Sequence, residues 1–361
     1  MAAFAHMKGV GMEGYLTLGS IVLATALSAQ SERKVTTLAT GVYAIEHQDS
    51  GDGFASGNTT VIIGDRQVFV VDAGFLPATA REDIAQIRRW TDKPVTFLLN
   101  THFHNDHNLA NRAYMDAFPA LTVIAHVETK KDMDMFGPGS ARREEEGLAS
   151  LQRMLVTGKA PDGNPLSAAD RTEVQSVLAR RQSVMEELKR ITFQSATLTF
   201  DHDFTIDLGN REVQVKFLGR GNTNGDAVVC LPKEQIVVAG DLVVTPIPYF
   251  YDGYPGEWIR TLQHLSALDA RTIVPGHGAI MHDDAYLQLM RELMQSAVSQ
   301  MGARLAQTRP AMFQTLDGLK GAVDLSAFRQ RFIGTDQSLN PAFDEMTAGL
   351  VKLVFEEASL R

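Results

Sequence analysis

The sequence predicts an α/β protein with a four-layer αββα sandwich, in which two β-sheets pack face to face between layers of helices. Two separate blocks of the chain, at residues 35–90 and 197–268, each run from β-branched strands into a helix. Hydrophobic residues make up 44% of the chain and charged residues 21%, as in ordinary globular proteins. Because each block supplies strands and a helix that can cover them, the two blocks together predict the sandwich.

The elements of the first block follow from alternating β-branched runs and one stretch of helical spacing. The turn Gly64-Asp65-Arg66 separates two strands of a hairpin, and Pro94 ends the first helix. We expect strands at 35–46, 59–63, 67–71, 95–100 and 121–126, and helices at 80–90 and 108–118.

The rest of the chain divides into an insertion, a second block and an extension. Residues 128–190 are charged and carry two helical patterns, at 142–156 and 168–189, which predict a helical insertion in a core domain of residues 30–282. The second block predicts strands over 197–244, a helix at 257–268 and a strand at 272–274. Residues 283–361 are mostly helical in pattern and form a C-terminal extension packed on the core.

The N-terminus and the overall charge bear on location and partners. Residues 1–29 contain an apolar run that ends in Ala26-Leu27-Ser28-Ala29, which is typical of a signal peptide and favours a periplasmic or secreted protein; the alternative is a leader retained on a cytoplasmic protein. The formal net charge of −9 argues against nucleic-acid binding. No later stretch predicts stable membrane insertion, and the single cysteine, Cys230, lies in an apolar run typical of a buried residue. The sequence makes no prediction of oligomeric state.

The string from Asn100 to His107 contains three histidines and an aspartate within six residues, directly after a predicted strand. Imidazole nitrogens and carboxylate oxygens are natural ligands of zinc. A loop can aim His102 and His104 at one ion while Asp106 and His107 turn toward a second. A solvated polar loop is the alternative, but it gives no reason for three histidines.

This string, His-x-His-x-Asp-His, resembles the signature of the metallo-β-lactamase superfamily, and further motifs follow in the family's order. Val70-Val71-Asp72-Ala73-Gly74 is similar to the motif whose aspartate supports the histidine loop through a hydrogen bond. Ala239-Gly240-Asp241 is similar to the motif whose aspartate bridges both metals. Pro275-Gly276-His277-Gly278 is similar to the motif whose histidine binds the second metal, and its glycines indicate close backbone approach. The resemblance runs from about residue 35 to about residue 281.

One motif departs from the family pattern. Gly219-Arg220-Gly221-Asn222-Thr223-Asn224-Gly225-Asp226 places Asn222 where the family has the third histidine of the first metal site. An amide oxygen is a weaker zinc ligand than imidazole, so the first metal is expected to bind less tightly than the second. Asn222 either ligates the metal or only hydrogen-bonds a water or the loop. His126 is the best candidate for a replacement ligand, although a supporting residue or a packed strand end fits it better. We expect His47, His202, His264 and His282 at the surface or in turns.

The resemblance implies a zinc-dependent hydrolase with up to two Zn²⁺ ions about 3.5–4 Å apart and a metal-activated hydroxide. It implies that Asp106 is the catalytic residue, which orients the nucleophile and returns a proton to the leaving group. The substrate is expected to be a small molecule, with a cyclic amide or ester such as a β-lactam as the first candidate. Phosphoester or thioester hydrolysis is one alternative, and a non-catalytic metal-binding accessory protein is another.

Four residues are candidates for the wall of a substrate pocket. Tyr249 and Tyr251 lie in an aromatic stretch after Asp241, Arg220 lies in the departing motif, and Phe136 follows two methionines at the start of the insertion. Pocket walls are largely apolar and aromatic, which is the reason for choosing the two tyrosines; core and loop packing is the alternative for them. Phe136 could belong to a lid over the metals, with packing inside the insertion as its alternative.

Overall fold

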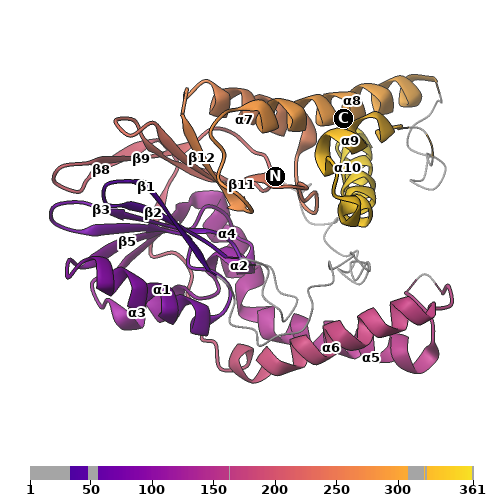
Figure 1. The fold of residues 1–361 in the computed structure, drawn as a ribbon, viewed down its shortest axis with the longest axis horizontal. Coiled ribbons are helices and arrows are strands. Elements are labelled where there is room, and N and C mark those ends of the chain that lie inside the picture. Colours follow the sequence, from indigo (N-terminus) through magenta and orange to yellow (C-terminus); the bar gives the residue numbers. More distant parts are fainter. Residues whose placement is uncertain (1–32, 48–55, 162, 308–320, 322, 360–361) are drawn as a thin grey trace, which may run out of the picture.

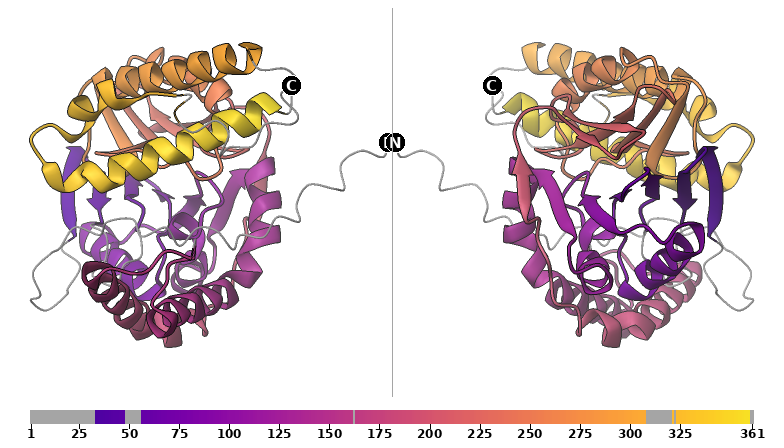
Figure 2. Two further views of the ribbon diagram at one scale, coloured as in Figure 1. Left: turned by 90° about the vertical axis from the view of Figure 1, so that its right-hand side faces the viewer. Right: turned by 90° about the vertical axis from the view of Figure 1, so that its left-hand side faces the viewer.

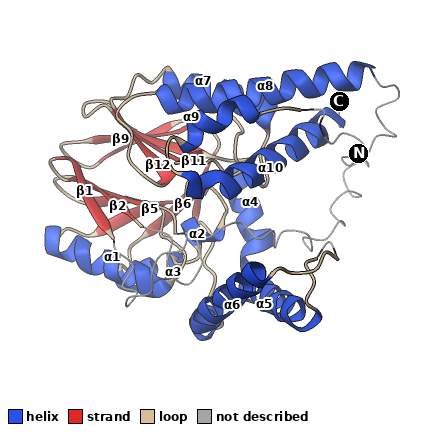
Figure 3. Ribbon diagram, turned by 45° about the vertical axis from the view of Figure 1, so that its right-hand side comes forward, coloured by secondary structure: helices blue, strands red, loops and turns tan. Residues whose placement is uncertain are grey.

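Two β-sheets lie against each other with helices on their outer faces, as Figures 1 and 3 show. The computed structural model describes residues 33–47, 56–161, 163–307, 321 and 323–359. The predicted signal peptide at 1–29 lies outside the described residues. Within them, no helix has both the length and the apolar character that crossing a bilayer requires. The predicted α/β sandwich is confirmed.

The first sheet contains seven strands in chain order. Its first four strands form antiparallel hairpins, and the last four run parallel to one another, beginning with β4. The strands are β1 (Lys34–Ala39), β2 (Val42–Glu46), β3 (Thr59–Ile63), β4 (Val68–Val71), β5 (Val95–Leu99), β6 (Thr122–His126) and β7 (Leu198–Phe200). The single strand expected over 35–46 is wrong, because Gly41 adopts a positive φ of 76° and turns the chain back into a hairpin.

The second sheet contains five strands in the order β12-β11-β10-β9-β8. Its strands are β8 (Phe204–Asp207), β9 (Glu212–Phe217), β10 (Ala227–Leu231), β11 (Ile236–Val244) and β12 (Thr272–His277). β8 to β11 are antiparallel neighbours, whereas β12 returns parallel to β11 after a helix crosses between them. β7 was expected in this block but pairs with β6, so the chain changes sheets between residues 200 and 204.

Three layers of buried side chains hold the sandwich together. One layer lies between the sheets and joins residues such as Phe69 and Ile124 to Val229 and Val238. A second layer packs the outer face of the first sheet against α1 (Pro77–Trp90) and α3 (Asn111–Ala117). A third packs the second sheet against α7 (Pro255–Ser266) and the C-terminal helices, and includes the buried Cys230.

The insertion and the extension lie on opposite sides of the molecule, in magenta and in orange to yellow in Figure 2. The insertion holds α4 (Val127–Phe136), the 3₁₀ turn η1 (Gly137–Gly139), α5 (Ser140–Thr157) and α6 (Ala168–Leu188), close to the expected helices. The extension holds α8 (Ala285–Gln307), η4 (Ser326–Phe328), α9 (Arg329–Ile333), η5 (Gln337–Leu339) and α10 (Asn340–Ser359). The extension packs on α7 through the third layer.

A candidate metal centre

The motifs singled out in the sequence meet at one edge of the sandwich. The histidine string follows β5 and contains the short helix α2 (Asn105–Asn108). Asp241 lies in β11 next to Gly240, where the pairing with β12 shifts register, and His277 ends β12. Strands from both sheets therefore deliver their polar ends to the same place.

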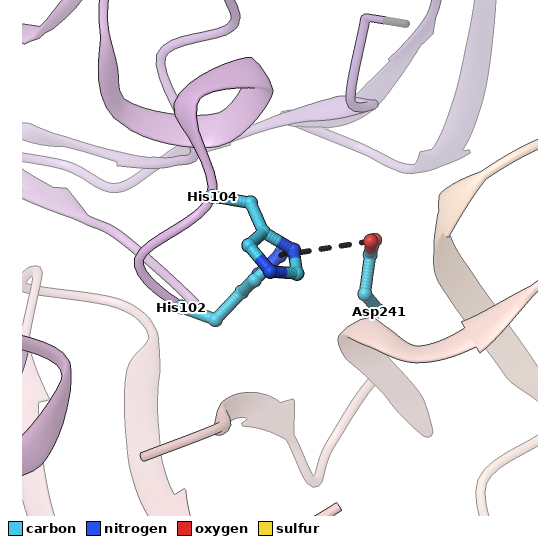
Figure 4. A group of neighbouring side chains, drawn as sticks. All are labelled: His102, His104 and Asp241. Atoms are coloured by element: carbon cyan, nitrogen blue, oxygen red, sulfur yellow. Dashed lines mark hydrogen bonds and ion pairs between the residues drawn. The ribbon is translucent and has the colours of Figure 1, made fainter. Parts of the chain in front are cut away.

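Six of the predicted ligands form two adjacent groups. The first group contains His102, His104 and Asp241, and the second contains Asp106, His107 and His277; within each group the ligand atoms lie within 4.8 Å of one another. Figure 4 shows His102 and His104 beside Asp241. Nε2 of His102 lies 3.0 Å from Nδ1 of His104 and 3.6 Å from Oδ2 of Asp241. Oδ1 of Asp241 lies 3.2 Å from Nε2 of His107, so its carboxylate faces both groups.

The second group brings imidazole nitrogens and carboxylate oxygens together. Nδ1 of His107 lies 2.8 Å from the carboxylate of Asp72 and therefore carries the ring proton. Its Nε2 faces the group, 3.1 Å from Nε2 of His277 and 3.4 Å from Oδ2 of Asp106. Oδ1 of Asp241 is buried and has no hydrogen-bond partner. Converging lone pairs of imidazole and carboxylate suit a divalent cation, so the residues present fit the zinc that the sequence predicts.

Burial and charge act in opposite directions on these groups. Burial lowers the pKa of His107, but the carboxylates of Asp241, Asp106 and Asp72 outweigh burial and raise it well above its ordinary value. Burial opposes ionisation of Asp241 as well, yet His107 and the other imidazoles hold its pKa far below the usual range. Burial and the neighbouring His107 lower the pKa of His102 well below its ordinary value. Metal binds ionised carboxylates and neutral imidazoles, so an ion that binds through Nε2 of His107 must displace the proton that the carboxylates favour there.

Asp72, the predicted supporting residue, contacts the histidine loop through both carboxylate oxygens. Its φ of 61° turns the side chain at the end of β4 toward the histidine loop. Besides the contact with His107, it accepts hydrogen bonds from the backbone N–H and the hydroxyl of Thr101, both at 2.8 Å. Thr101 Oγ1 also lies 3.0 Å from Nδ1 of His102. One buried carboxylate thus orients a histidine of each group.

Two glycines allow this close packing. A Cβ on Gly276 would lie 1.8 Å from Oδ1 of Asp241, and a Cβ on Gly57 would lie 2.4 Å from the ring of His107. The close approach expected beside His277 is therefore present. The sequence did not identify Gly57, because it lies outside any motif and nothing in the sequence shows that it contacts His107.

Asn222 and His126 lie near the histidine string, and His126 belongs to neither ligand group. Asn222 is buried in the 219–226 loop, and its Nδ2 has no hydrogen-bond partner. The loop ends beside the histidine string, where the Ala227 N–H donates to Thr101 O at 2.8 Å. His126 caps α4 by accepting from the Glu128 N–H, and its ring stacks on Phe217 at 4.2 Å. His126 is therefore a packed strand end, one of the two roles expected for it.

The four pocket candidates differ in their relation to the centre. Tyr249 packs edge-on against His277 with ring centroids 5.8 Å apart, and Tyr251 stacks on Tyr249 at the same distance. Phe136 contacts Phe103, whose ring lies against His104.

Arg220 faces a different element from the other three candidates. It pairs with Glu257 of α7, and its guanidinium lies 4.1 Å from the centroid of the Tyr254 ring. Its pocket role therefore has no direct support in these contacts.

Two further contacts were missed from the sequence. Asp252, in the aromatic stretch after β11, places Oδ2 3.4 Å from Nε2 of His104. No spacing rule connects residues 148 positions apart, so only the fold reveals this pair. His47, expected at the surface, is buried with Nε2 3.1 Å from Asp83 Oδ2; that expectation is wrong because α1 covers the end of β2.

Comparisons with known proteins agree with this fold. Metallo-β-lactamase type 2 from Bacillus cereus is 28% identical over 118 residues, which are 31% of this chain and 43% of that relative, so the match spans less than half of the relative. The metallo-β-lactamase from Pontibacter korlensis is 19% identical with a TM-score of 0.50, covering 73% of this chain and 99% of its own. FIM-1 from Pseudomonas aeruginosa, in its mono-zinc form, is 14% identical with a TM-score of 0.51, covering 73% and 96%. These structures share the fold.

A family model described as the metallo-β-lactamase superfamily matches residues 52–277, more than half of the 361-residue chain. That range contains both ligand groups and excludes the C-terminal extension. The chain belongs to the metallo-β-lactamase superfamily.

Proposed function

We propose that this protein is a zinc hydrolase that opens a cyclic amide or ester in a small substrate, with β-lactams as the first class to test. The observation that carries the proposal is the pair of adjacent ligand groups that share Asp241. When bound there, zinc supplies Lewis acidity that makes hydroxide available at neutral pH and polarises the scissile carbonyl. The relatives named above are metallo-β-lactamases, which supports the choice of substrate class.

The exposure of the ligands indicates where the substrate meets the centre. The side chains of His102 and His107 are fully buried, whereas those of His104 and Asp106 are each 20% exposed. The substrate therefore approaches past His104 and Asp106. Oδ2 of Asp106 lies 2.9 Å from Nε2 of His277, which holds the carboxylate at the edge of the second group. We assign to Asp106 the transfer of a proton from the nucleophile to the leaving group.

Tyr249 and Tyr251 extend the apolar surface next to this open edge. Tyr251 is 49% exposed and stacks on Tyr249, which in turn covers His277. We assign to this pair the side of the pocket that packs against apolar parts of the substrate. With two divalent ions bound, the negative charges of Asp106, Asp241 and one hydroxide would leave the site with a formal charge of +1. This local positive charge favours an anionic substrate, although the protein as a whole is acidic.

The two groups do not offer equal numbers of ligands. Apart from the shared Asp241, the second group has a carboxylate and two imidazoles, whereas the first has two imidazoles. We propose that the first group binds zinc more weakly than the second. Asn222 is the candidate for its missing donor, because it is buried in the loop that adjoins the histidine string.

The test is hydrolysis of a chromogenic cephalosporin by the zinc-loaded protein, with Asp106→Ala as the comparison. We expect turnover that the substitution reduces by at least about 100-fold, as for loss of a general acid–base group. If the protein hydrolyses a chromogenic phosphodiester or thioester but not the cephalosporin, the cyclic amide or ester is refuted as the substrate class. Equal rates for wild type and Asp106→Ala would refute the assigned role of Asp106.

A further inference from the structure

The loop of residues 247–254, which follows β11, contacts both ligand groups from outside. Tyr249 packs on His277 of the second group, and Asp252 reaches His104 of the first. Nδ1 of His104 faces Nε2 of His102, so the nitrogen that Asp252 approaches is the one directed away from the group. The contact therefore leaves the ligand atom of His104 free while engaging the opposite side of its ring.

A histidine that binds metal through one nitrogen is oriented by the partner of its other nitrogen. His102 has the hydroxyl of Thr101 at its Nδ1, and His107 has the carboxylate of Asp72. For His104 the corresponding partner is Asp252, at 3.4 Å. A carboxylate there accepts the Nε2 proton and leaves Nδ1 with its lone pair toward the group.

We propose that Asp252 is a positioning residue that orients His104 and thereby sets the zinc affinity of the first group. The inference rests on the proposed function, because it takes His102, His104 and Asp241 as ligands of one zinc ion. The first group is the one to which such a residue matters most, because it has only two ligands of its own. If the ring of His104 is misoriented, the first group loses one of these two ligands.

The fold holds Asp252 in place from both sides. Toward the centre, the Tyr254 N–H donates to Gly221 O at 2.8 Å, and the Tyr254 hydroxyl donates to Asn224 Oδ1 at 2.5 Å. Gly253 lies so close that a Cβ there would be 3.0 Å from Gly221 O. The 247–254 loop is thereby fastened to the same 219–226 loop that carries Asn222.

On its other side the loop rests on the C-terminal extension. A Cβ on Gly349 of α10 would lie 2.7 Å from Phe250 O, so this helix packs directly on the loop backbone. Glu357 of α10 accepts a hydrogen bond from the Gly256 N–H at 2.8 Å, at the start of α7. The extension lies outside the residues matched by the family model. It thus gives this chain its own support for the position of Asp252.

The test measures the two zinc affinities separately, by competition with a chromophoric chelator, in wild type, Asp252→Asn and Asp252→Ala. The Asp252 side chain is 61% exposed and its contact is long, so the expected loss is at the lower end of the usual range, about tenfold. The loss should affect the weaker zinc, whereas the affinity of the tighter zinc should stay within about twofold. Asp252→Glu should recover part of the loss because it retains a carboxylate.

Asp207→Asn is the matched control. Asp207 is also 61% exposed and pairs with Arg66 at 3.1 Å, but it lies at the end of β8 away from the ligands. Its substitution should change neither zinc affinity. Glu357→Gln tests the support from α10 and should weaken the same weaker zinc, by less than Asp252→Asn does.

The results separate the inference from the proposed function. If wild type binds two zinc ions and hydrolyses substrate, but Asp252→Asn retains both affinities, the positioning role of Asp252 is refuted and the proposed function stands. If wild type binds no zinc in the first group, both the role of Asp252 and the two-zinc centre are refuted. Equal weakening of both zinc ions would also refute the role, because it indicates a general disturbance of the site.

Discussion

Replacing Asp72 by asparagine should weaken the tighter zinc by about 10- to 100-fold while leaving the fold intact. The backbone of Asp72 has a φ of 61°, a left-handed conformation that asparagine tolerates as readily as aspartate. The substitution also preserves the size of the side chain. Any loss of zinc affinity therefore reports the hydrogen bonds and charge of the carboxylate rather than a rearranged strand end.

The magnitude follows from the contacts of the two carboxylate oxygens. Oδ1 accepts from the Thr101 N–H, while Oδ2 accepts from the Thr101 hydroxyl and from Nδ1 of His107, each at 2.8 Å. In the asparagine variant, the oxygen can keep the backbone contact, but the amide nitrogen then faces His107 and donates to it. The ring proton of His107 moves to Nε2, the atom that faces His277. Hydrogen bonds to charged groups contribute about 1.5–3 kcal/mol, which corresponds to roughly 10- to 150-fold in affinity.

Zinc affinity is measured by chelator competition, together with far-UV circular dichroism and the melting temperature. Asp83→Asn is the control, because Asp83 is also buried and paired, with Arg33 and His47, but lies in α1 away from the ligands. It should lower the melting temperature without changing zinc affinity. A folded Asp72→Asn protein whose zinc affinity stays within twofold of wild type would refute the reasoning.

Three further predictions concern the first group, a buried carboxylate and the metal itself. Asn222→His should give the first group a third imidazole, so the protein should retain two zinc ions after dialysis that leaves wild type with one; unchanged metal content would show that position 222 does not face the group. In metal-free protein, burial raises the pKa of Asp226 from 3.8 to about 6, so the native state binds this proton more tightly than the unfolded state. The free energy of unfolding should therefore fall by up to roughly 3 kcal/mol as the pH rises from about 4 to about 6, a fall that Asp226→Asn should lack in urea titrations; parallel profiles would contradict this. Chelation should lower the melting temperature, because zinc at about 100 times its Kd stabilises the native state by about 2.7 kcal/mol. An unchanged melting temperature would argue against bound metal.

The fold was predictable where the apolar residues that define an element in the sequence also pack against the core. The strands at 59–63 and 95–99 and the helix ending at Trp90 lie within a few residues of their expected bounds, because the same apolar positions that define them also face the core. Predictions of strand bounds and strand pairing were wrong where a turn or a neighbouring strand, rather than the apolar pattern, determines the structure. The 35–46 stretch alternates throughout, so only the turn at Gly41 divides it into two strands. Leu198–Phe200 joins the first sheet because β6 presents an open edge to it.

Ligand positions were more accessible to sequence reasoning than the residues around them. The histidine string places four chemically distinctive side chains within six residues, and the structure places two of them in each ligand group. Supporting residues are ordinary aspartates, threonines and glycines whose role depends on what they contact. Asp72 was found through its motif, whereas Asp252 and Gly57 lie outside any motif and required the fold.

The open edge of the centre links metal binding to substrate access. His104 and Asp106 are the ligands whose side chains are partly exposed, and each belongs to a different group. On the proposed function, a substrate that reaches both groups passes the ring of His104, which Asp252 of the 247–254 loop contacts. The loop rests on α10, in the extension beyond the family-matched residues. We therefore predict that changes in the extension alter both the zinc occupancy of the first group and the shape of the proposed entrance, without any change in a ligand.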